Sequence, residues 1–185
     1  AIDMNGDGLH FIDVDDSNVF FDVNGDGWRR RMAWTSPGDG LLAYDKNQDG
    51  KIDQWDEISF VPYAPQGQTD LESLKLAFDS NRDGLLTAAD EAWAKFGVWQ
   101  DANSNGVTDA GEFKSLTELG IASIKLTSDG KFQVIDGQTV HGMTVATRTN
   151  GAQLAVGDVT LNISNETQVT QGGTTTTVAL PAHQA

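Results

Sequence analysis

The sequence contains no cysteine among its 185 residues, which excludes disulfide bonds and metal sites built from thiolates. No run approaches the roughly 18 consecutive apolar residues of a membrane helix, so we expect no membrane insertion. The first residues lack the basic start and apolar core of a signal peptide. We therefore expect an export signal elsewhere, or a chain that is an excised piece. The scattered His10, His141 and His183 disfavour a zinc site.

Basic residues are also scarce. Twelve lysines and arginines stand against 27 acidic residues, which gives a net charge of −15. Such a charge disfavours nucleic acids and anionic membranes as partners. The sequence has neither a Gly-x-Ser-x-Gly nucleophile motif nor a basic cluster for phosphate, so no conventional hydrolase site is predicted.

The acidic residues gather in five repeats of the form Asp-x-Asn-x-Asp/Asn-Gly, which start at Asp3, Asp22, Asp45, Asp79 and Asp101. Oxygen side chains at positions 1, 3 and 5, followed by a glycine at 6, follow the ligand order of a calcium loop. Mg²⁺ fits less well, because it keeps several of its waters. We expect about three to five Ca²⁺ ions as the cofactor, and a chain that like-charge repulsion destabilises in their absence.

Three of the loops carry a full set of expected ligands. In the third loop they are Asp45, Asn47, Asp49, the Lys51 carbonyl, Asp53, and either Asp56 or Glu57. In the fourth loop they are Asp79, Asn81, Asp83, the Leu85 carbonyl, Thr87 and Asp90. In the fifth loop they are Asp101, Asn103, Asn105, the Val107 carbonyl, Asp109 and Glu112. The fourth site is predicted to be weaker than a site closed by glutamate, because aspartate at position 12 is shorter.

The first two loops are less complete. Their opening triplets are Asp3, Asn5, Asp7 and Asp22, Asn24, Asp26. At position 12 they have Val14 and Ala33 in place of an acid. The remaining ligands are expected from nearby acids, with Asp13, Asp15 and Asp16 as candidates. The alternative is an Asx-stabilised turn that holds no metal.

The predicted fold class is α+β. Residues 1–69 are read as short strands and turns around calcium loops. Residues 69–120 are read as an EF-hand-like helix-loop-helix-loop-helix, with helices at 70–78, 88–96 and 111–119. From residue 121 onward we expect antiparallel β hairpins with Asp-Gly and Asn-Gly turns. Residues 1–163 are expected to form one calcium-binding module, and residues 164–185 a Thr/Gly-rich tail, linker or weak edge strand.

The order of the sequence blocks is also informative. Ala1-Ile2-Asp3-Met4-Asn5-Gly6-Asp7-Gly8 is followed by Val19-Phe20-Phe21-Asp22-Val23-Asn24-Gly25-Asp26-Gly27, and later by Val98-Trp99-Gln100-Asp101 and Ser115-Leu116-Thr117-Glu118-Leu119-Gly120-Ile121. Over residues 1–163 this order resembles the calcium-dependent self-processing module of FrpC-like RTX proteins. The resemblance implies a large bacterial protein that leaves the cell by type I secretion and is found outside the cell or on its surface.

The resemblance also implies an activity. In the family, Ca²⁺ folds the module, and folding triggers autocatalytic cleavage of an Asp-Pro bond at its N-terminal edge. The new C-terminal aspartate passes through a cyclic anhydride, which a lysine can capture as an isopeptide crosslink. The implied partners are therefore the upstream segment of the same chain and a lysine, here or on a partner protein.

This sequence departs from the family pattern in three places. It has no Asp-Pro bond, so we expect the scissile bond just upstream of Ala1 and name no catalytic residue in this chain. The usual Glu-Leu-Phe-Gly is replaced by Glu57-Ile58-Ser59-Phe60, and the stretch that follows is short and proline-bearing. The RTX nonapeptide is also absent. The alternative function is a non-catalytic, calcium-stabilised structural or adhesive domain of a large secreted protein.

Overall fold

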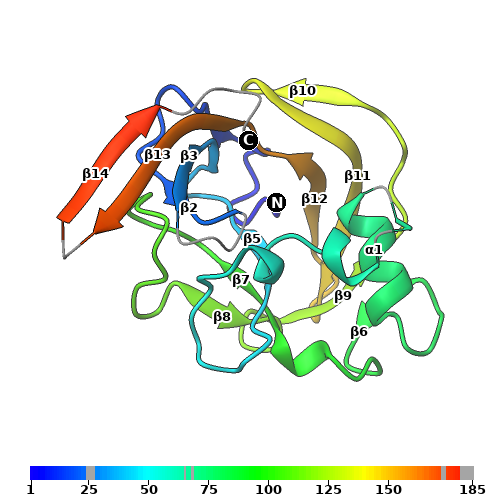
Figure 1. The fold of residues 1–185 in the computed structure, drawn as a ribbon. Helices are drawn as coiled ribbons and strands as arrows, with labels where there is room; N and C mark the ends of the chain where they lie inside the picture. The colour runs from blue at the N-terminus through cyan, green and yellow to red at the C-terminus, as the bar shows by residue number, and fades with distance from the viewer. Residues whose placement is uncertain (24–27, 65, 68, 172–173, 180–185) are drawn as a thin grey trace.

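The computed structural model describes residues 1–23, 28–64, 66–67, 69–171 and 174–179. Within these residues the fold is mostly β, with fourteen strands in four sheets and a single α-helix, α1 (Asp70–Phe78). Three 3-10 turns, η1 (Trp55–Glu57), η2 (Val61–Tyr63) and η3 (Trp93–Lys95), complete the helical elements of the described chain. None of these helices is long and apolar enough to cross a membrane. Figure 1 shows α1 on one side of the strands.

The predicted α+β class with an EF-hand-like helix-loop-helix-loop-helix is wrong. Helix α1 begins after Thr69, whose side chain caps it by accepting the Glu72 N–H. At 88–96, however, only η3 forms, and it leads directly into a strand. At 111–119 the structure has turns around another short strand. Isolated helices of fewer than about 12 residues are marginal, and these segments gain more by burying side chains in a sheet.

Those two segments and one upstream strand form a three-stranded sheet. The strands are β5 (Leu41–Tyr44), β7 (Phe96–Trp99) and β8 (Phe113–Ser115), in the order β5-β7-β8. All four residues of β7 are buried, and the strand pairs antiparallel with both neighbours. The fifth acidic loop is therefore a connection between two paired strands and not between two helices.

The largest sheet has five antiparallel strands. They are β6 (Leu85–Thr87), β9 (Ile121–Lys125), β10 (Gln133–Ile135), β11 (Gln138–Arg148) and β12 (Gln153–Thr160). Asp136-Gly137 joins β10 to β11, and the residues there have φ angles of 50° and 81°. Positive φ at both central residues is the requirement of the tight hairpin turn that Asp-Gly favours. Helix α1 packs against β12 and β6 of this sheet.

Two smaller sheets hold the remaining strands. One pairs β1 (Phe11–Ile12) with β4 (Trp34–Thr35). The other has the order β14-β13-β3-β2 and consists of β14 (Thr174–Ala179), β13 (Ile163–Gln171), β3 (Arg29–Met32) and β2 (Phe20–Phe21). The segment expected from sequence to be a tail, linker or weak edge strand thus belongs to two strands, β13, which pairs with β3, and β14, which pairs with β13. A domain boundary at residue 163 stays a prediction. Figure 1 shows the β13–β14 hairpin on the far side of the molecule from α1.

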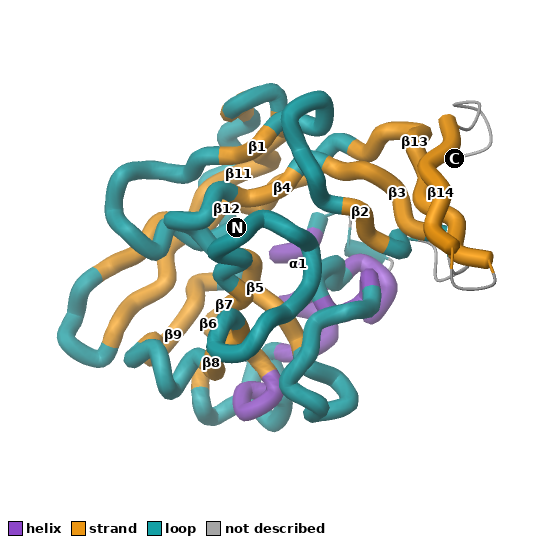
Figure 2. The backbone as a smooth tube through the Cα atoms, turned by 90° about the vertical axis from the view of Figure 1, so that its left-hand side faces the viewer, coloured by secondary structure: helices purple, strands orange, loops and turns teal. Residues whose placement is uncertain are grey.

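The N-terminal residues run through the centre of the fold. Ile2 is fully buried in the main apolar cluster together with Leu74 of α1 and Phe96 of β7. It forms bridges to Gly40 on one side and to Val156 of β12 on the other. Figures 1 and 2 show the N-terminus inside the ring of strands and not at the edge of the molecule. The start of the chain therefore connects the β5 and β12 sheets.

Candidate functional site

The acidic loops share one backbone conformation. In each of the third, fourth and fifth loops the first aspartate accepts the N–H of the glycine at position 6. The three bonds are Gly50 to Asp45 Oδ2 at 2.8 Å, Gly84 to Asp79 Oδ2 at 2.8 Å, and Gly106 to Asp101 Oδ2 at 2.7 Å. In the first loop Asp3 accepts the N–H groups of Gly6 and Gly8, both at 2.9 Å. The opening aspartates therefore organise their own loops.

Positions 4 and 6 have positive φ in each of the three later loops. Position 4 is occupied by Gln48, Arg82 and Ser104, with φ between 54° and 58°. Position 6 is a glycine with φ between 69° and 80° in all three loops. Glycine adopts this region without steric cost, which explains its place in the motif. The chain consequently turns around the first carboxylate in the same way each time.

The third loop brings three carboxylates together. One oxygen from each of Asp45, Asp49 and Glu57 lies within 4.8 Å of the others. Glu57 is completely buried, and its Oε2 accepts the N–H groups of Asp53 and Gln54. Asp56 instead forms an ion pair with Lys46 at 2.6 Å. Of the two residues left open by the sequence, the structure places Glu57 in the cluster.

Glu57 has a buried carboxylate oxygen that a bound cation could contact. Its Oε1 is buried without a hydrogen-bond partner in the described structure. Burial, together with the charges of Asp53 and Asp45, raises its pKa to about 7, against the lowering effect of the two peptide N–H bonds. A buried carboxylate oxygen without a partner is costly. A divalent cation among these three oxygens would supply the missing partner, so the residues fit a metal ion.

The first loop has a similar cluster with an unexpected member. Asp3, Asp7 and Asp39 place one oxygen each within 4.8 Å of one another. Asp39 is completely buried, and its Oδ2 accepts the His10 N–H at 2.8 Å and the Ser36 hydroxyl at 3.1 Å. Its Oδ1 has no hydrogen-bond partner among the described residues. Burial raises the pKa of Asp39, and the nearby Asp3 and Asp7 raise it further.

The sequence did not predict Asp39 as a ligand of the first loop; the predicted candidates were Asp13, Asp15 and Asp16. Asp13 instead accepts hydrogen bonds from the Val14 N–H and the Gln138 amide. Asp15 and Asp16 are exposed at a turn. Asp39 reaches the first loop because Gly40, the next residue, pairs with Ile2 next to Asp3. This contact is long-range, and the local spacing of acids carries no signal for it.

The fourth and fifth loops are closed by other carboxylates. Asp90 is buried and accepts the N–H groups of Ser80 and Thr87, both at 2.9 Å. Glu112 accepts the N–H groups of Asp109 and Ala102 at 2.9 and 3.0 Å. These residues hold the ends of their loops in place. Their role as ligands stays a prediction.

Among the described residues the other predicted ligands form no further cluster of three carboxylates. The amide groups of Asn103 and Asn105 donate to Asp109 Oδ2, and those of Asn47 and Asn81 donate to Asp49 and Asp83. Lys51, Leu85 and Val107 stand directly after the loop glycines. In the second loop Asp22 is described, whereas Asn24 and Asp26 lie outside the described residues.

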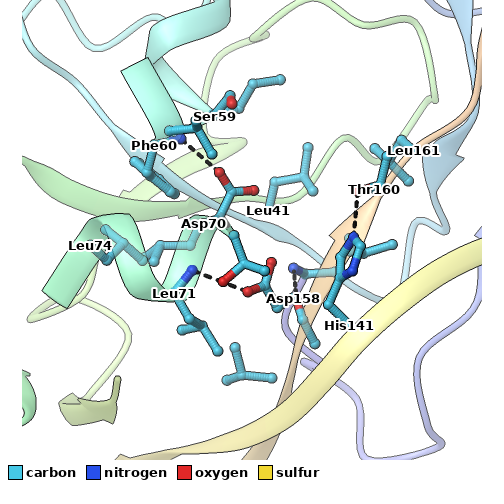
Figure 3. Close-up of a pocket in the computed structure, with 18 of the residues that line it drawn as sticks. Leu41, Ser59, Phe60, Asp70, Leu71, Leu74, His141, Asp158, Thr160 and Leu161 are labelled. Atoms are coloured by element: carbon cyan, nitrogen blue, oxygen red, sulfur yellow. Dashed lines mark hydrogen bonds between the residues drawn. The ribbon is translucent and has the colours of Figure 1, made fainter. Parts of the chain in front are cut away.

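A cavity of about 250 Å³ lies where the N-terminus meets β12 and α1. Ala1, Asp70, Asp158 and His141 line it, with apolar side chains around them. Asp70 Oδ1 accepts the Phe60 N–H at 2.8 Å, and Asp158 Oδ2 accepts the Leu71 N–H at 3.2 Å. Figure 3 shows these side chains and bonds in the wall of the cavity. Two carboxyl groups therefore stand close to the start of the chain.

The SPM domain family matches residues 1–162. The chain belongs to the SPM domain family. It is also 33% identical over 174 residues to the iron-regulated protein FrpA of Neisseria meningitidis serogroup C. These two findings confirm the resemblance to an FrpC-like self-processing module.

The SPM domain match covers most of the chain but little of the relative. The alignment spans 89% of this chain and 15% of FrpA. The match to the family ends just before β13 begins at Ile163. The first-loop and third-loop clusters lie within the SPM domain match, as do all residues that line the N-terminal cavity except Ile163.

Proposed function

We propose that this SPM domain binds Ca²⁺ through its acidic loops and folds as it does so. The observation that carries the proposal is the pair of clusters formed by Asp3, Asp7, Asp39 and by Asp45, Asp49, Glu57. Each contains a buried carboxylate oxygen without a hydrogen-bond partner in the described structure. Bound Ca²⁺ would neutralise these charges, and the binding free energy would stabilise the folded state.

Calcium is favoured over other ions by the chemistry of the candidate ligands. They are carboxylate, amide and carbonyl oxygens, the ligands of a hard cation, and the chain has no thiolate. Weak sites suffice where calcium is abundant, as it is outside the cell. We therefore place the parent protein in the secreted or cell-surface class, in line with the resemblance to FrpC-like RTX proteins.

The second part of the proposal is self-processing of the parent protein. Folding of the domain would drive cleavage of an Asp-Pro bond just upstream of residue 1, followed by hydrolysis of the resulting anhydride or its capture by a lysine as an isopeptide. Membership of the SPM domain family supports this part. So does the position of the N-terminal segment, which pairs with β12 on one side and with Gly40, the residue before β5, on the other, so that an upstream bond would be fixed in one geometry.

One experiment tests both parts. The chain is extended upstream by about ten native residues, purified in chelator, and then mixed with millimolar Ca²⁺. Tryptophan fluorescence reports folding, because Trp34 donates to Asp101 and Trp99 lies near Glu112 in the fifth loop. Mass spectrometry reports release of the upstream peptide and any crosslinked species.

The outcomes separate the candidate functions. Folding together with release at an Asp-Pro bond supports the full proposal. Folding without release leaves the non-catalytic, calcium-stabilised domain. If Ca²⁺ does not change the tryptophan fluorescence, the proposal that Ca²⁺ folds the domain is refuted. The proposed trigger for cleavage is then refuted as well.

A further inference from the structure

The structure fixes the direction from which an upstream segment reaches residue 1. Ala1 and Gly157 exchange two peptide hydrogen bonds, with the Ala1 amine donating to Gly157 at 2.9 Å and the Gly157 N–H donating to Ala1 at 2.8 Å. The Asp3 N–H donates to Ala155 at 2.9 Å. These bonds define an antiparallel register between the N-terminal residues and β12.

This register continues into the cavity. The residue before Ala1 would lie opposite Asp158, and the next one upstream opposite Val159. Asp158, Val159 and Thr160 all line the cavity. Alternate residues of a strand direct their peptide groups to the same edge. The N–H and C=O of Val159 therefore point to the edge of β12 at which Gly157 already pairs with Ala1. An upstream segment would thus pair with β12 and occupy the cavity.

Two carboxyl groups flank this path. Asp158 is buried and accepts the N–H of Leu71, the second residue of α1. Asp70, the first residue of α1, accepts the Phe60 N–H. Burial lowers the pKa of the Ala1 amine, whereas the charges of Asp158, Asp70 and Asp39 raise it. Asp70 and Asp158 line the same cavity as Ala1, so both carboxyl groups lie close to the first backbone nitrogen.

In a chain that continues upstream, the amine of Ala1 is a neutral peptide nitrogen. Burial raises the pKa of Asp70 and the charge of Asp158 raises it further, whereas the N–H groups of Phe60 and Val61 and the charged amine lower it. Without the amine, the half-buried Asp70 and the buried Asp158 line one cavity that has no lysine or arginine among the described residues of its wall. Burial and the neighbouring charge of Asp158 both favour the protonated form of Asp70, which is the form that can donate a proton.

We propose that Asp70 is the general acid that protonates the leaving nitrogen of the upstream Asp-Pro bond. This inference rests on the proposed self-processing function. The side-chain carboxylate of the upstream aspartate attacks its own main-chain carbonyl carbon, and the carbon–nitrogen bond to proline breaks. The proton of Asp70 moves to the proline nitrogen. The products are a cyclic anhydride, a neutral proline amine and the Asp70 carboxylate, so charge and atoms balance. Water then opens the anhydride.

The decisive variant is Asp70→Asn in the chain extended through the scissile bond. Asparagine keeps an oxygen that can accept the Phe60 N–H but has no acidic proton. We expect the variant to fold with Ca²⁺, as judged by tryptophan fluorescence and circular dichroism. We expect its single-turnover cleavage rate to fall at least about 100-fold, the range of general acid catalysis. The matched control is Glu72→Gln, an exposed acid of the same helix, and it should cleave at the wild-type rate.

The pH profile adds a second readout. The wild-type rate should fall as pH rises through the pKa of Asp70, because only the protonated carboxyl group can donate. The charged and titratable groups that face Asp70 across the cavity are Asp158 and His141. Asp158→Asn removes a like charge, so it should shift the falling limb to lower pH. In Asp70→Asn the residual cleavage rate should no longer fall with rising pH in this range.

The outcomes are distinct. A folded Asp70→Asn chain that cleaves at the wild-type rate overturns the proposal, as does loss of cleavage on His141→Asn with Asp70→Asn active. If Asp70→Asn does not fold, the pH dependence of the wild-type cleavage rate decides. A rate that does not fall with rising pH overturns the proposal. A fall that Asp158→Asn moves to lower pH supports it. Wild-type chain that folds but never releases the peptide refutes the self-processing function itself.

Discussion

At the scale of single residues, the informative groups are carboxylates that are buried without a full set of partners. Glu57 and Asp39 are both completely shielded from solvent, and each leaves one oxygen unbonded among the described residues. The sequence could identify the loops, because their ligand spacing is local. It left Glu57 and Asp56 as alternatives, because the choice depends on which side chain η1 turns inward. It missed Asp39, because the pairing of Ile2 with Gly40 is long-range.

Glu57→Gln tests the third-loop cluster. The substitution keeps the size of the side chain and removes one of three negative charges around the expected ion, so Ca²⁺ affinity should fall by about tenfold or more. The matched control is Asp56→Asn, which removes a charge next to the loop but outside the cluster and should change affinity far less. Calorimetric titration measures both. Equal losses in the two variants would contradict the assignment of Glu57.

The raised pKa of Glu57 predicts a pH dependence with a definite sign. Its pKa without the ion is about 7 in the folded chain, against 4.5 in the unfolded chain. The folded state therefore holds an extra proton between these values, and the contribution of Glu57 to stability without Ca²⁺ is lost as pH rises towards 7. Ca²⁺ binding must release that proton, so calcium affinity should rise from pH 5 to pH 7. Titrations across this range in wild type and Glu57→Gln should differ, with the variant less dependent on pH.

Asp39→Asn tests the first loop. Loss of this buried carboxylate should reduce the number of Ca²⁺ ions bound at millimolar calcium by one, because Asp3 and Asp7 alone supply too few oxygens. Asp15→Asn, at an exposed position suggested by sequence proximity, serves as the control and should leave the number unchanged. Native mass spectrometry counts the ions. If only the Asp15 variant bound fewer Ca²⁺ ions, Asp15 and not Asp39 would be the ligand of the first loop.

At the scale of elements, the same loop conformation is compatible with different neighbours. The fourth loop follows a helix and precedes strand β6, whereas the fifth lies between strands β7 and β8. In both loops the glycine N–H at position 6 donates to the opening aspartate, and this bond within the loop does not specify which elements flank it. The helix at 70–78 could be predicted from its cap and its apolar spacing. The expected helices at 88–96 and 111–119 could not be corrected from sequence, since their apolar residues are buried by partner strands far along the chain.

Helix α1 offers a matched pair of leucines. Leu74 is 2% exposed and packs in the main core, while Leu76 on the same helix is 58% exposed. Leu74→Ala should lower the free energy of unfolding in saturating Ca²⁺ by about 2–5 kcal/mol. Leu76→Ala should change it by less than about 0.5 kcal/mol. Urea denaturation followed by circular dichroism compares the two. Similar losses would mean that α1 does not pack on β12 as described.

At the scale of the whole molecule, charge and topology act against each other. The chain carries a net charge of −15, and its fold gathers three carboxylates at the first loop and three at the third loop, with the oxygens of each cluster within 4.8 Å of one another. The N-terminal residues that connect β5 to β12 are the same ones that carry the first loop. Repulsion in that loop therefore opposes a contact that joins two sheets. We infer that the cation stabilises the tertiary structure as well as the individual loops.

Removal of the ion should consequently expand the entire molecule. A compact chain of 185 residues has a radius of gyration of about 16 Å, and an unfolded one about 46 Å. Small-angle scattering in chelator should give a value well above the compact one, and millimolar Ca²⁺ should restore it. NaCl at about 1 M screens exposed charges but reaches buried ones poorly, so it should restore compactness only in part. Mg²⁺ at the same concentration should be less effective than Ca²⁺, because it gives up its waters reluctantly. A chelated chain that stays near 16 Å would show that burial of the apolar cores outweighs the repulsion of the loops without any ion.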